Sequence, residues 1–348
     1  MIREVRGRPL EDIIASDKQN NFQLLRLIAA VMVMENHSHL LLYDKTRDAY
    51  NSLYFHISHL GLPSFFFLSG LLVTQSLDHS SSWKHFLWKR ILRIYPAACL
   101  SVLAAALIMG PVVTTLPLKE YFLSPLLYRY LATCSLLHIS FLLPGVFSHS
   151  VLGSPAVNAS LWTVSMELKL YIGLLLTWQI PVVWRKRLWP PLIIAAIVCY
   201  TWKVQYIPVF YRPWFTFGVQ FLSGTLCYHY KDKIIIPSYG MILIPLLILF
   251  SIWLHIWLYT AYLLIPALVI CAGAFAVPWI KKITPKPDLS YGIYVFAFPV
   301  QQLVANYLHP AGPLQMLTLS LIAVCPLAIL SWYAVEKKAL QLKDRIPS

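Results

Sequence analysis

The stretch Phe22-Gln-Leu-Leu-Arg-Leu-Ile-Ala-Ala-Val-Met-Val-Met-Glu-Asn-His-Ser-His-Leu-Leu-Leu42 decides the fold. Its length is about that needed to cross a bilayer, roughly 20 residues at 1.5 Å per residue. It nevertheless contains Arg26, Glu35, His37 and His39. A charge inside a membrane costs about 3 kcal/mol, so such residues usually face the interior of a helix bundle or a water-filled cavity. The stretch therefore predicts a membrane helix that carries polar groups inward.

Arg26 and His37 are eleven positions apart. A helix turns by about 100° per residue, so their side chains return to within about 20° of the same face, separated by roughly 16 Å along the axis. Either residue alone could be a satisfied interior polar group, but their shared face, with Glu35 beside them, favours a functional site. Glu35 lies about 200° around the helix from His37, so a regular helix keeps its carboxylate away from the imidazole.

The whole chain has the composition of a polytopic membrane protein. Of its 348 residues, 58% are hydrophobic and 12% are charged, which is about half the charged fraction of a soluble domain. A net charge of +14 would suggest nucleic acid as the partner of a soluble protein. The positive-inside rule explains that charge better here, so we expect contact with membrane lipid and none with nucleic acid. The six cysteines have no metal-ligand spacing, which predicts neither a disulfide framework nor a metal site.

The apolar runs predict an all-α polytopic membrane protein with about ten transmembrane helices. We place them at 22–42, 59–77, 87–110, 161–183, 189–206, 210–229, 237–256, 259–280, 290–308 and 314–335. Twenty of the Lys and Arg residues then fall on one side of the membrane and six on the other. Because Lys and Arg are enriched in cytoplasmic loops, both termini are predicted to be cytoplasmic.

The region 111–160 is not predicted to be a further crossing. A single crossing there would move Arg185-Lys186-Arg187 to the wrong side, and prolines together with Gly153 interrupt the region. We therefore predict a non-spanning cap on the outer side. The remaining organisation consists of the following segments: a cytoplasmic lead-in at 1–21, a membrane domain at 22–336 and a cytoplasmic basic tail at 337–348.

Three further stretches carry motifs. Gly61-Leu-Pro-Ser-Phe-Phe-Phe-Leu-Ser-Gly70 has small residues that permit close helix packing. Arg90 and Arg93 are neighbours on one helix face at the predicted inner boundary. They could form an interfacial anchor or a phosphate clamp, because guanidinium groups suit phosphate oxygens. Glu167, within an otherwise apolar helix, could pair with a cation or contact a polar substrate.

Taken together, these stretches resemble the acyltransferase-3 family of integral membrane acyltransferases, which modify cell-surface glycans. The resemblance covers essentially the whole chain, in order. It rests on Arg26-x10-His37, Phe65-Phe-Phe-Leu-Ser-Gly70, Arg90-x-x-Arg93-Ile-Tyr-Pro96, Ser160-Leu-Trp-Thr-Val-Ser-Met-Glu167, Leu289-Ser-Tyr-Gly-Ile-Tyr294 and Glu336. Where the family often has a histidine after the last tyrosine motif, this chain has Ala297, so no second imidazole is assigned.

The resemblance implies an enzyme that moves an acyl group, most often acetyl, from cytoplasmic acyl-CoA (acetyl-CoA). The acceptor would be a hydroxyl of a cell-surface glycan or lipid-linked oligosaccharide, and the location a bacterial inner membrane. Arg26, Arg90 and Arg93 would hold the donor. His37 would take the acceptor's proton as general base, or would itself form an acyl-enzyme, and the residues leave both schemes open.

Two carboxylates and two aromatic residues complete the expected site. Glu35 or Glu167 would orient the imidazole or help to bind the sugar. On the same helix as Glu167, Trp162 and Tyr171 are expected to contact the acceptor.

Two other classes of function fit intramembrane polar residues. A transporter or flippase for a lipid-linked sugar or anion would line its pathway with Arg26, His37 and Glu167, and would move substrate without consuming acyl-CoA. A non-catalytic membrane assembly subunit would tolerate His37→Ala.

Overall fold

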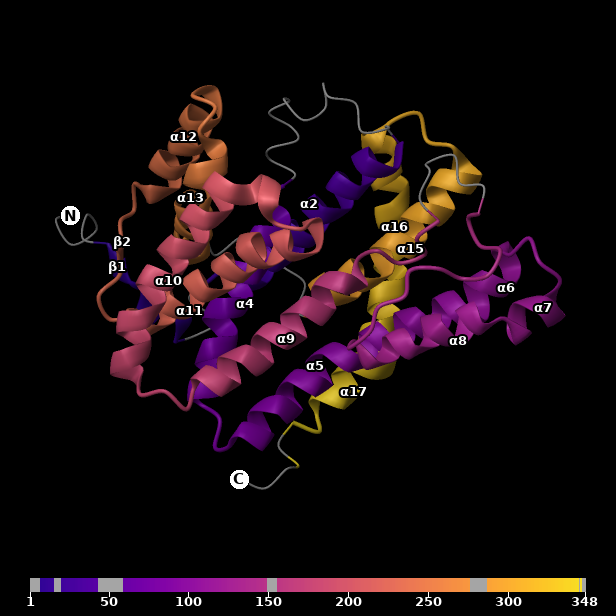
Figure 1. Cartoon of the computed structure of the whole chain (residues 1–348), viewed down its shortest axis with the longest axis horizontal. Coiled ribbons are helices and arrows are strands. Elements are labelled where there is room, and N and C mark those ends of the chain that lie inside the picture. Colours follow the sequence, from indigo (N-terminus) through magenta and orange to yellow (C-terminus); the bar gives the residue numbers. More distant parts are fainter. Residues whose placement is uncertain are drawn as a thin grey trace. The chain divides into compact units, whose positions relative to one another are not determined.

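The computed structural model describes residues 7–15, 20–42, 59–148, 155–275, 287–343 and 345. In these parts the chain is predominantly helical (Figure 1), and a helix overlaps each segment predicted to span the membrane. These helices are α2 (Phe22–Leu42), α4 (Gly61–Asp78), α5 (Trp83–Ala104), α9 (Leu161–Thr177), α10 (Val182–Lys203), α11 (Val219–His229), α12 (Gly240–Trp253), α13 (Trp257–Ala274), α15 (Ser290–Leu308) and α16 (Pro313–Ser331). The helical fold is therefore confirmed, while 276–280, the end of the eighth predicted span, lies outside the described residues.

Three helical segments among the described residues are long and apolar enough to cross a membrane: Trp83–Val113, Trp257–Ala274 and Pro313–Leu340. The first continues α5 through a π-helical turn, Ala105–Met109, into α6 (Gly110–Val113). The last continues α16 through a second π-helical turn, Trp332–Glu336, into α17 (Lys337–Leu340). The count of ten crossings and the cytoplasmic location of the termini stay predictions.

The chain divides into two compact units. The first is made from 1–32, 52–79 and 170–286, and the second from 33–51, 80–169 and 287–348. Helices α2 and α9 each contribute to both units, since the division falls within them.

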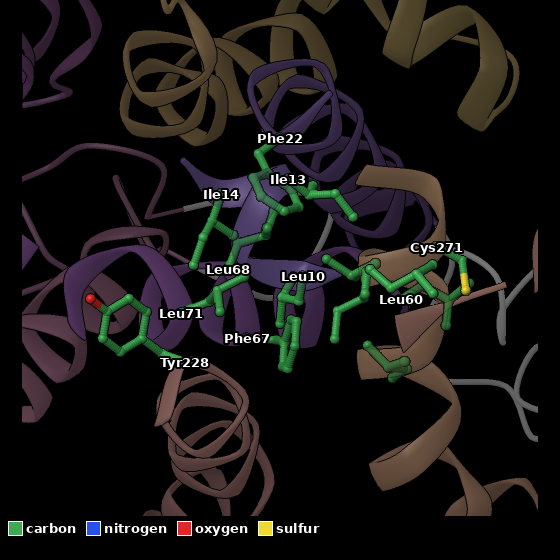
Figure 2. Close-up of a cluster of buried hydrophobic side chains, with 14 residues drawn as sticks. Leu10, Ile13, Ile14, Phe22, Leu60, Phe67, Leu68, Leu71, Tyr228 and Cys271 are labelled. Atoms are coloured by element: carbon green, nitrogen blue, oxygen red, sulfur yellow. The ribbon is translucent and has the colours of Figure 1, made fainter. Parts of the chain in front are cut away.

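In the first unit, the polar lead-in is attached to segments that come much later in the chain. Strand β1 (Arg8–Pro9) pairs antiparallel with β2 (Ile235–Ile236), and α1 (Leu10–Ile14) follows directly. Figure 2 shows Leu10 and its neighbours on α1 beside Phe67 and Leu71 of α4. Burial of a large apolar side chain contributes about 1.5–3 kcal/mol, which is sufficient to hold so short a helix in place.

Helices α4 and α11 pack closely because glycines line their contact. A Cβ added at Gly70 would collide with the backbone of Phe221, and one at Gly224 would collide with the backbone of α4. Across the same contact, Thr74 Oγ1 donates a hydrogen bond to Thr225 Oγ1 at 3.1 Å. The prediction that the second span uses small residues for helix packing is confirmed.

In the second unit, the chain beyond α6 turns back along α5. Helices α7 (Leu118–Leu123) and α8 (Pro125–Leu131) follow in this segment, and neither is long enough to cross a bilayer. The hydroxyl of Tyr121 donates to the carbonyl oxygen of Ala106 at 2.7 Å, and farther along the segment the Ser135 carbonyl accepts a hydrogen bond.

The hydroxyl of Tyr95 on α5 donates this hydrogen bond to the carbonyl oxygen of Ser135, with the two oxygen atoms 2.9 Å apart. Tyr95 and Ala106 are eleven residues apart on one helical run, so the returning segment follows about 16 Å of it. The chain then comes back to its start, because the amide of Thr115 donates to the carbonyl oxygen of Gly145 at 3.0 Å. We call residues 114–146 the α7–α8 hairpin; its membrane side and its role as a cap stay predictions.

Candidate functional site

His37 lies in the half of α2 that belongs to the second unit, and its side chain is half-buried. Its ring packs edge-on against Phe298 of α15, with the ring centroids 5.0 Å apart. Its Nδ1 is buried and has no hydrogen-bond partner among the described residues. An imidazole can donate or accept at this nitrogen, so no side chain in the described structure selects its tautomer.

Gln301 of α15 holds the turn of α2 that carries His37. Its Nε2 donates to the carbonyl oxygen of Met34 at 2.6 Å and to Ser38 Oγ at 3.0 Å. Ser38 Oγ in turn donates to the same carbonyl at 3.0 Å, and both polar side chains are fully buried. Gln301 is not among the residues predicted from the sequence motifs, although a polar residue inside an apolar helix is a signal of such a role.

Glu35 is placed against His39. Its Oε1 lies 3.5 Å from Nε2 of His39, one helical turn further along α2. This is the geometry expected of a regular helix, in which residues four apart are neighbours.

Helix α9 meets α15 through buried hydroxyl groups. The hydroxyl of Thr163 is hydrogen-bonded to the hydroxyl of Tyr294, which also donates to the carbonyl oxygen of Ser160 at 3.4 Å. Glu167 lies one turn beyond Thr163 on the same face of α9 and is half-buried, as is Trp162. This contact therefore brings α9, the helix that carries Glu167, next to the Leu289–Tyr294 motif at the start of α15.

A second polar network fixes the middle of α15. Ser101 of α5 donates from Oγ to the carbonyl oxygen of Val295 at 2.8 Å. Asn158 Nδ2 donates to the same carbonyl at 2.9 Å and to Ser101 Oγ at 3.1 Å. All three residues are buried, so this network sets where the neighbouring Tyr294 lies.

Arg93 has an acidic partner that the sequence motifs did not indicate. Its Nη2 lies 2.6 Å from Oδ2 of Asp288, and its guanidinium lies over the ring of Tyr291 at 5.9 Å. Asp288 Oδ1 accepts from the hydroxyl of Ser290 at 2.5 Å, at the start of α15. Arg90, one turn before Arg93 on α5, is half-buried.

Glu336 is also buried in the second unit. It accepts a hydrogen bond at Oε1 from the hydroxyl of Ser331 at 2.8 Å, within the π-helical end of α16. The ion pairs found among the described residues include none with Glu336.

Two predicted site residues belong to the first unit. Arg26 is half-buried in the first half of α2. Tyr171 is buried on α9, with its hydroxyl 3.0 Å from Ser69 Oγ and its ring against Phe221. The second unit contains the other predicted site residues, which are Glu35, His37, Arg90, Arg93, Trp162 and Glu167. In the described parts of the chain, no three His, Cys, Asp or Glu side chains gather so as to hold a metal ion.

Comparison with known proteins gives the family. A family model described as an acyltransferase domain matches residues 19–337. An O-acetyl transferase of Shigella phage Sf6 is 26% identical over 339 residues, covering 93% of this chain and 96% of that protein. Nodulation protein 10 of Rhizobium leguminosarum bv. viciae is 28% identical over 360 residues, covering 95% and 96%. No solved structure matches. Since the family match extends over both units and all the predicted site residues, the chain belongs to the acyltransferase-3 family of enzymes.

Proposed function

We propose that this enzyme transfers an acyl group, acetyl in the simplest case, from cytoplasmic acyl-CoA to a hydroxyl of a cell-surface or lipid-linked glycan. The observation that carries the proposal is the family match over residues 19–337, which includes the motif around His37. The similarity to an O-acetyl transferase supports acetyl as the group and oxygen as the atom that receives it. We place the enzyme in a bacterial inner membrane.

In this proposal His37 acts as general base. Its imidazole takes the proton of the acceptor hydroxyl, whose oxygen attacks the thioester carbonyl. The tetrahedral intermediate then expels the CoA thiolate, which recovers the proton from the imidazolium. A well-positioned base contributes about 10²–10⁴-fold to the rate. The support is a half-buried imidazole whose surrounding helical turn is held by Gln301.

The donor is assigned to the arginines. A guanidinium has five N–H groups, so Asp288 can orient Arg93 through Nη2 while other N–H groups face a phosphate. Arg90, one turn away on α5, supplies a second cation for the same anion. Arg26 would hold a deeper part of the donor, and Trp162, Glu167 and Tyr171 stay assigned to the acceptor.

The proposal is tested by acetyl-CoA turnover with purified protein in lipid bilayers and candidate glycan acceptors. His37→Gln should lower kcat by about 10²-fold or more, because the base is lost. His39→Gln is the matched control, two residues along the same helix and paired with Glu35, and should stay within tenfold of the wild type. Persistent turnover by His37→Gln would remove His37 from the chemistry. Movement of a lipid-linked sugar without acetyl-CoA consumption would indicate a transporter.

The same preparation separates the two chemical schemes. Wild type and His37→Gln are mixed with labelled acetyl-CoA in the absence of acceptor and denatured at once. The general-base scheme predicts no label on either protein. Label on the wild type alone would replace that scheme with an acyl-His37 intermediate.

A further inference from the structure

A second cluster of basic and aromatic residues lies in the first unit and contains no residue assigned to acyl transfer. We call it the Arg185 cluster: Trp178, Arg185, Trp189 and His229. The guanidinium of Arg185 lies over the ring of Trp178 at 3.8 Å. The ring of His229 lies against Trp178 and Trp189, with centroids 5.9 Å and 5.3 Å apart. A cation and an imidazole therefore share one indole ring.

Three nitrogen atoms of this cluster are buried without a hydrogen-bond partner among the described residues. Arg185 is 6% exposed and His229 is 8% exposed. Nε and Nη1 of Arg185 and Nε2 of His229 are buried and have no hydrogen-bond partner among the described residues. The indole satisfies the face of the guanidinium, but the N–H groups lie in its plane and need acceptors of their own. Burial lowers the pKa of Arg185, and the negative charge of Asp78 opposes part of that shift.

The nearby carboxylates are engaged elsewhere. Asp78 accepts at Oδ2 from the hydroxyl of Tyr228 at 2.7 Å. Glu11 lies 3.4 Å from Nζ of Lys231. The ion pairs found among the described residues include none with Arg185. Asp78 therefore supplies negative charge near the cluster, while the unpartnered N–H groups of Arg185 remain able to bind an acceptor from outside these residues.

The surroundings indicate which anion. Lys186 lies over the ring of Tyr230 at 5.1 Å, and Arg187 lies over the 54%-exposed Trp184 at 5.7 Å. The charge pattern of the sequence places these residues at the inner membrane boundary, where aromatic side chains gather at headgroup level. Basic pockets between membrane helices on the cytoplasmic side bind anionic lipid headgroups.

We infer that the Arg185 cluster binds a phosphate ester, the headgroup of an anionic membrane phospholipid. The phosphate oxygens accept from the buried nitrogens of Arg185 and His229, and the acyl chains lie along the outer face of the helices. The inference does not depend on the proposed acyl transfer, because none of its residues takes part in it.

The test measures the melting temperature of the full-length protein in neutral detergent with increasing phosphatidylglycerol or phosphatidylcholine. The wild type should be stabilised by phosphatidylglycerol in preference to phosphatidylcholine. Arg185→Gln should raise the phosphatidylglycerol concentration for half of the effect at least tenfold. Arg187→Gln removes the same charge from an exposed side chain two residues away and should change that concentration less than threefold. No lipid preference in the wild type, or equal effects of the two substitutions, would overturn the inference.

Two milder substitutions keep the test decisive if Arg185→Gln does not fold. Arg185→Lys keeps the charge and loses Nε and Nη1, and His229→Gln keeps a polar side chain and loses the ring nitrogen. Each substitution should raise the phosphatidylglycerol concentration that gives half of the stabilisation at least threefold. An unchanged concentration in both variants would contradict the inference. Inorganic phosphate and glycerol 3-phosphate without lipid distinguish the source. Stabilisation equal to that by phosphatidylglycerol would overturn the lipid assignment in favour of a soluble phosphate.

Discussion

His37 depends on a neighbouring helix for its position. The edge-on contact with Phe298 and the bonds from Gln301 to the Met34 carbonyl and Ser38 both come from α15. A base must be held within hydrogen-bond reach of the proton that it removes. The residues that set the geometry of this imidazole are therefore far from it in the sequence.

Gln301→Leu should lower kcat about tenfold with little change in the KM for acetyl-CoA, the proposed donor, because it releases the turn of α2 around His37 without touching the residues proposed to bind that donor. Gln302→Leu is the matched control. Gln302 is equally buried on the same helix, but its Nε2 donates to the carbonyl oxygen of Ala156 at 2.6 Å. Steady-state kinetics of both variants provide the measurement, and an equal fall in kcat for the two would contradict a positioning role for Gln301.

Asp288→Asn should lower the free energy of unfolding by about 1–3 kcal/mol, because hydrogen bonds to charged groups are stronger than neutral ones and Arg93 then faces a neutral amide in place of a carboxylate. Solvent screens this partly exposed pair, so we expect the lower part of that range. Asp232→Asn makes the same chemical change at an exposed position and should have little effect. Thermal melting distinguishes them, and equal melting temperatures would show that the pair does not stabilise the fold.

At the scale of single elements, α4 and α11 are in close contact. Gly224→Ala should destabilise the protein by about 1–3 kcal/mol, because the added methyl group meets the backbone of α4. Gly173→Ala on α9 is the control. A Cβ there meets nothing within 4 Å, so the substitution should be neutral or stabilising by up to about 1 kcal/mol. If the melting temperature fell equally in both variants, the close approach of Gly224 to the backbone of α4 would be contradicted.

The α7–α8 hairpin is attached to the helical run Trp83–Val113 by the fully buried Tyr121. Tyr121→Phe should cost about 1 kcal/mol by removing the bond to the Ala106 carbonyl. Tyr128→Phe is the control, since the hydroxyl of Tyr128 bonds within the hairpin and its side chain is 59% exposed. Urea unfolding followed by circular dichroism compares them, and an unchanged midpoint for Tyr121→Phe would contradict the attachment.

Burial raises the pKa of Tyr121 to about 12 from the ordinary value of 10.0. The neutral phenol is thus favoured in the folded protein. Its contribution to stability is complete below pH 10 and is lost as the pH rises toward 12. The difference in stability between wild type and Tyr121→Phe should accordingly shrink over that interval.

At the scale of the whole molecule, long-range contacts agree with the charge pattern of the loops. The lead-in pairs with the loop after α11, where the amide of Leu10 donates to the carbonyl oxygen of Ile234 at 2.9 Å. In the other unit, Trp88 Nε1 donates to the carbonyl oxygen of Leu342 in the tail at 2.9 Å. Each contact joins segments that the positive-inside rule assigns to the same side.

Cysteine labelling in spheroplasts tests the predicted topology, in a protein whose six native cysteines are replaced by alanine. An impermeant maleimide should modify Val209→Cys in intact spheroplasts, because the loop between the fifth and sixth predicted spans is expected to lie outside. It should modify Asp232→Cys and Lys343→Cys only after the membrane is permeabilised. Labelling of Asp232→Cys in intact spheroplasts would reverse the assigned orientation of that loop.

The sequence by itself determined the features that depend on local patterns. Apolar runs of about twenty residues predicted where helices lie, and α2 begins and ends where its sequence predicted. The glycines of α4 predicted a close helix contact, since only small residues let two backbones approach. The motifs also predicted the family, because six short patterns in a fixed order are far more specific than any one of them.

Only the tertiary structure decided which polar groups meet. Arg93 and Asp288 are 195 positions apart, and Gln301 is 267 positions from the Met34 carbonyl that it binds. The same holds for the return of the α7–α8 hairpin along α5 and for the unpartnered nitrogens of the Arg185 cluster. The helical period determines which residues share a face of a helix. Which neighbouring helix that face contacts depends on how the helices pack, and the packing depends on the whole chain.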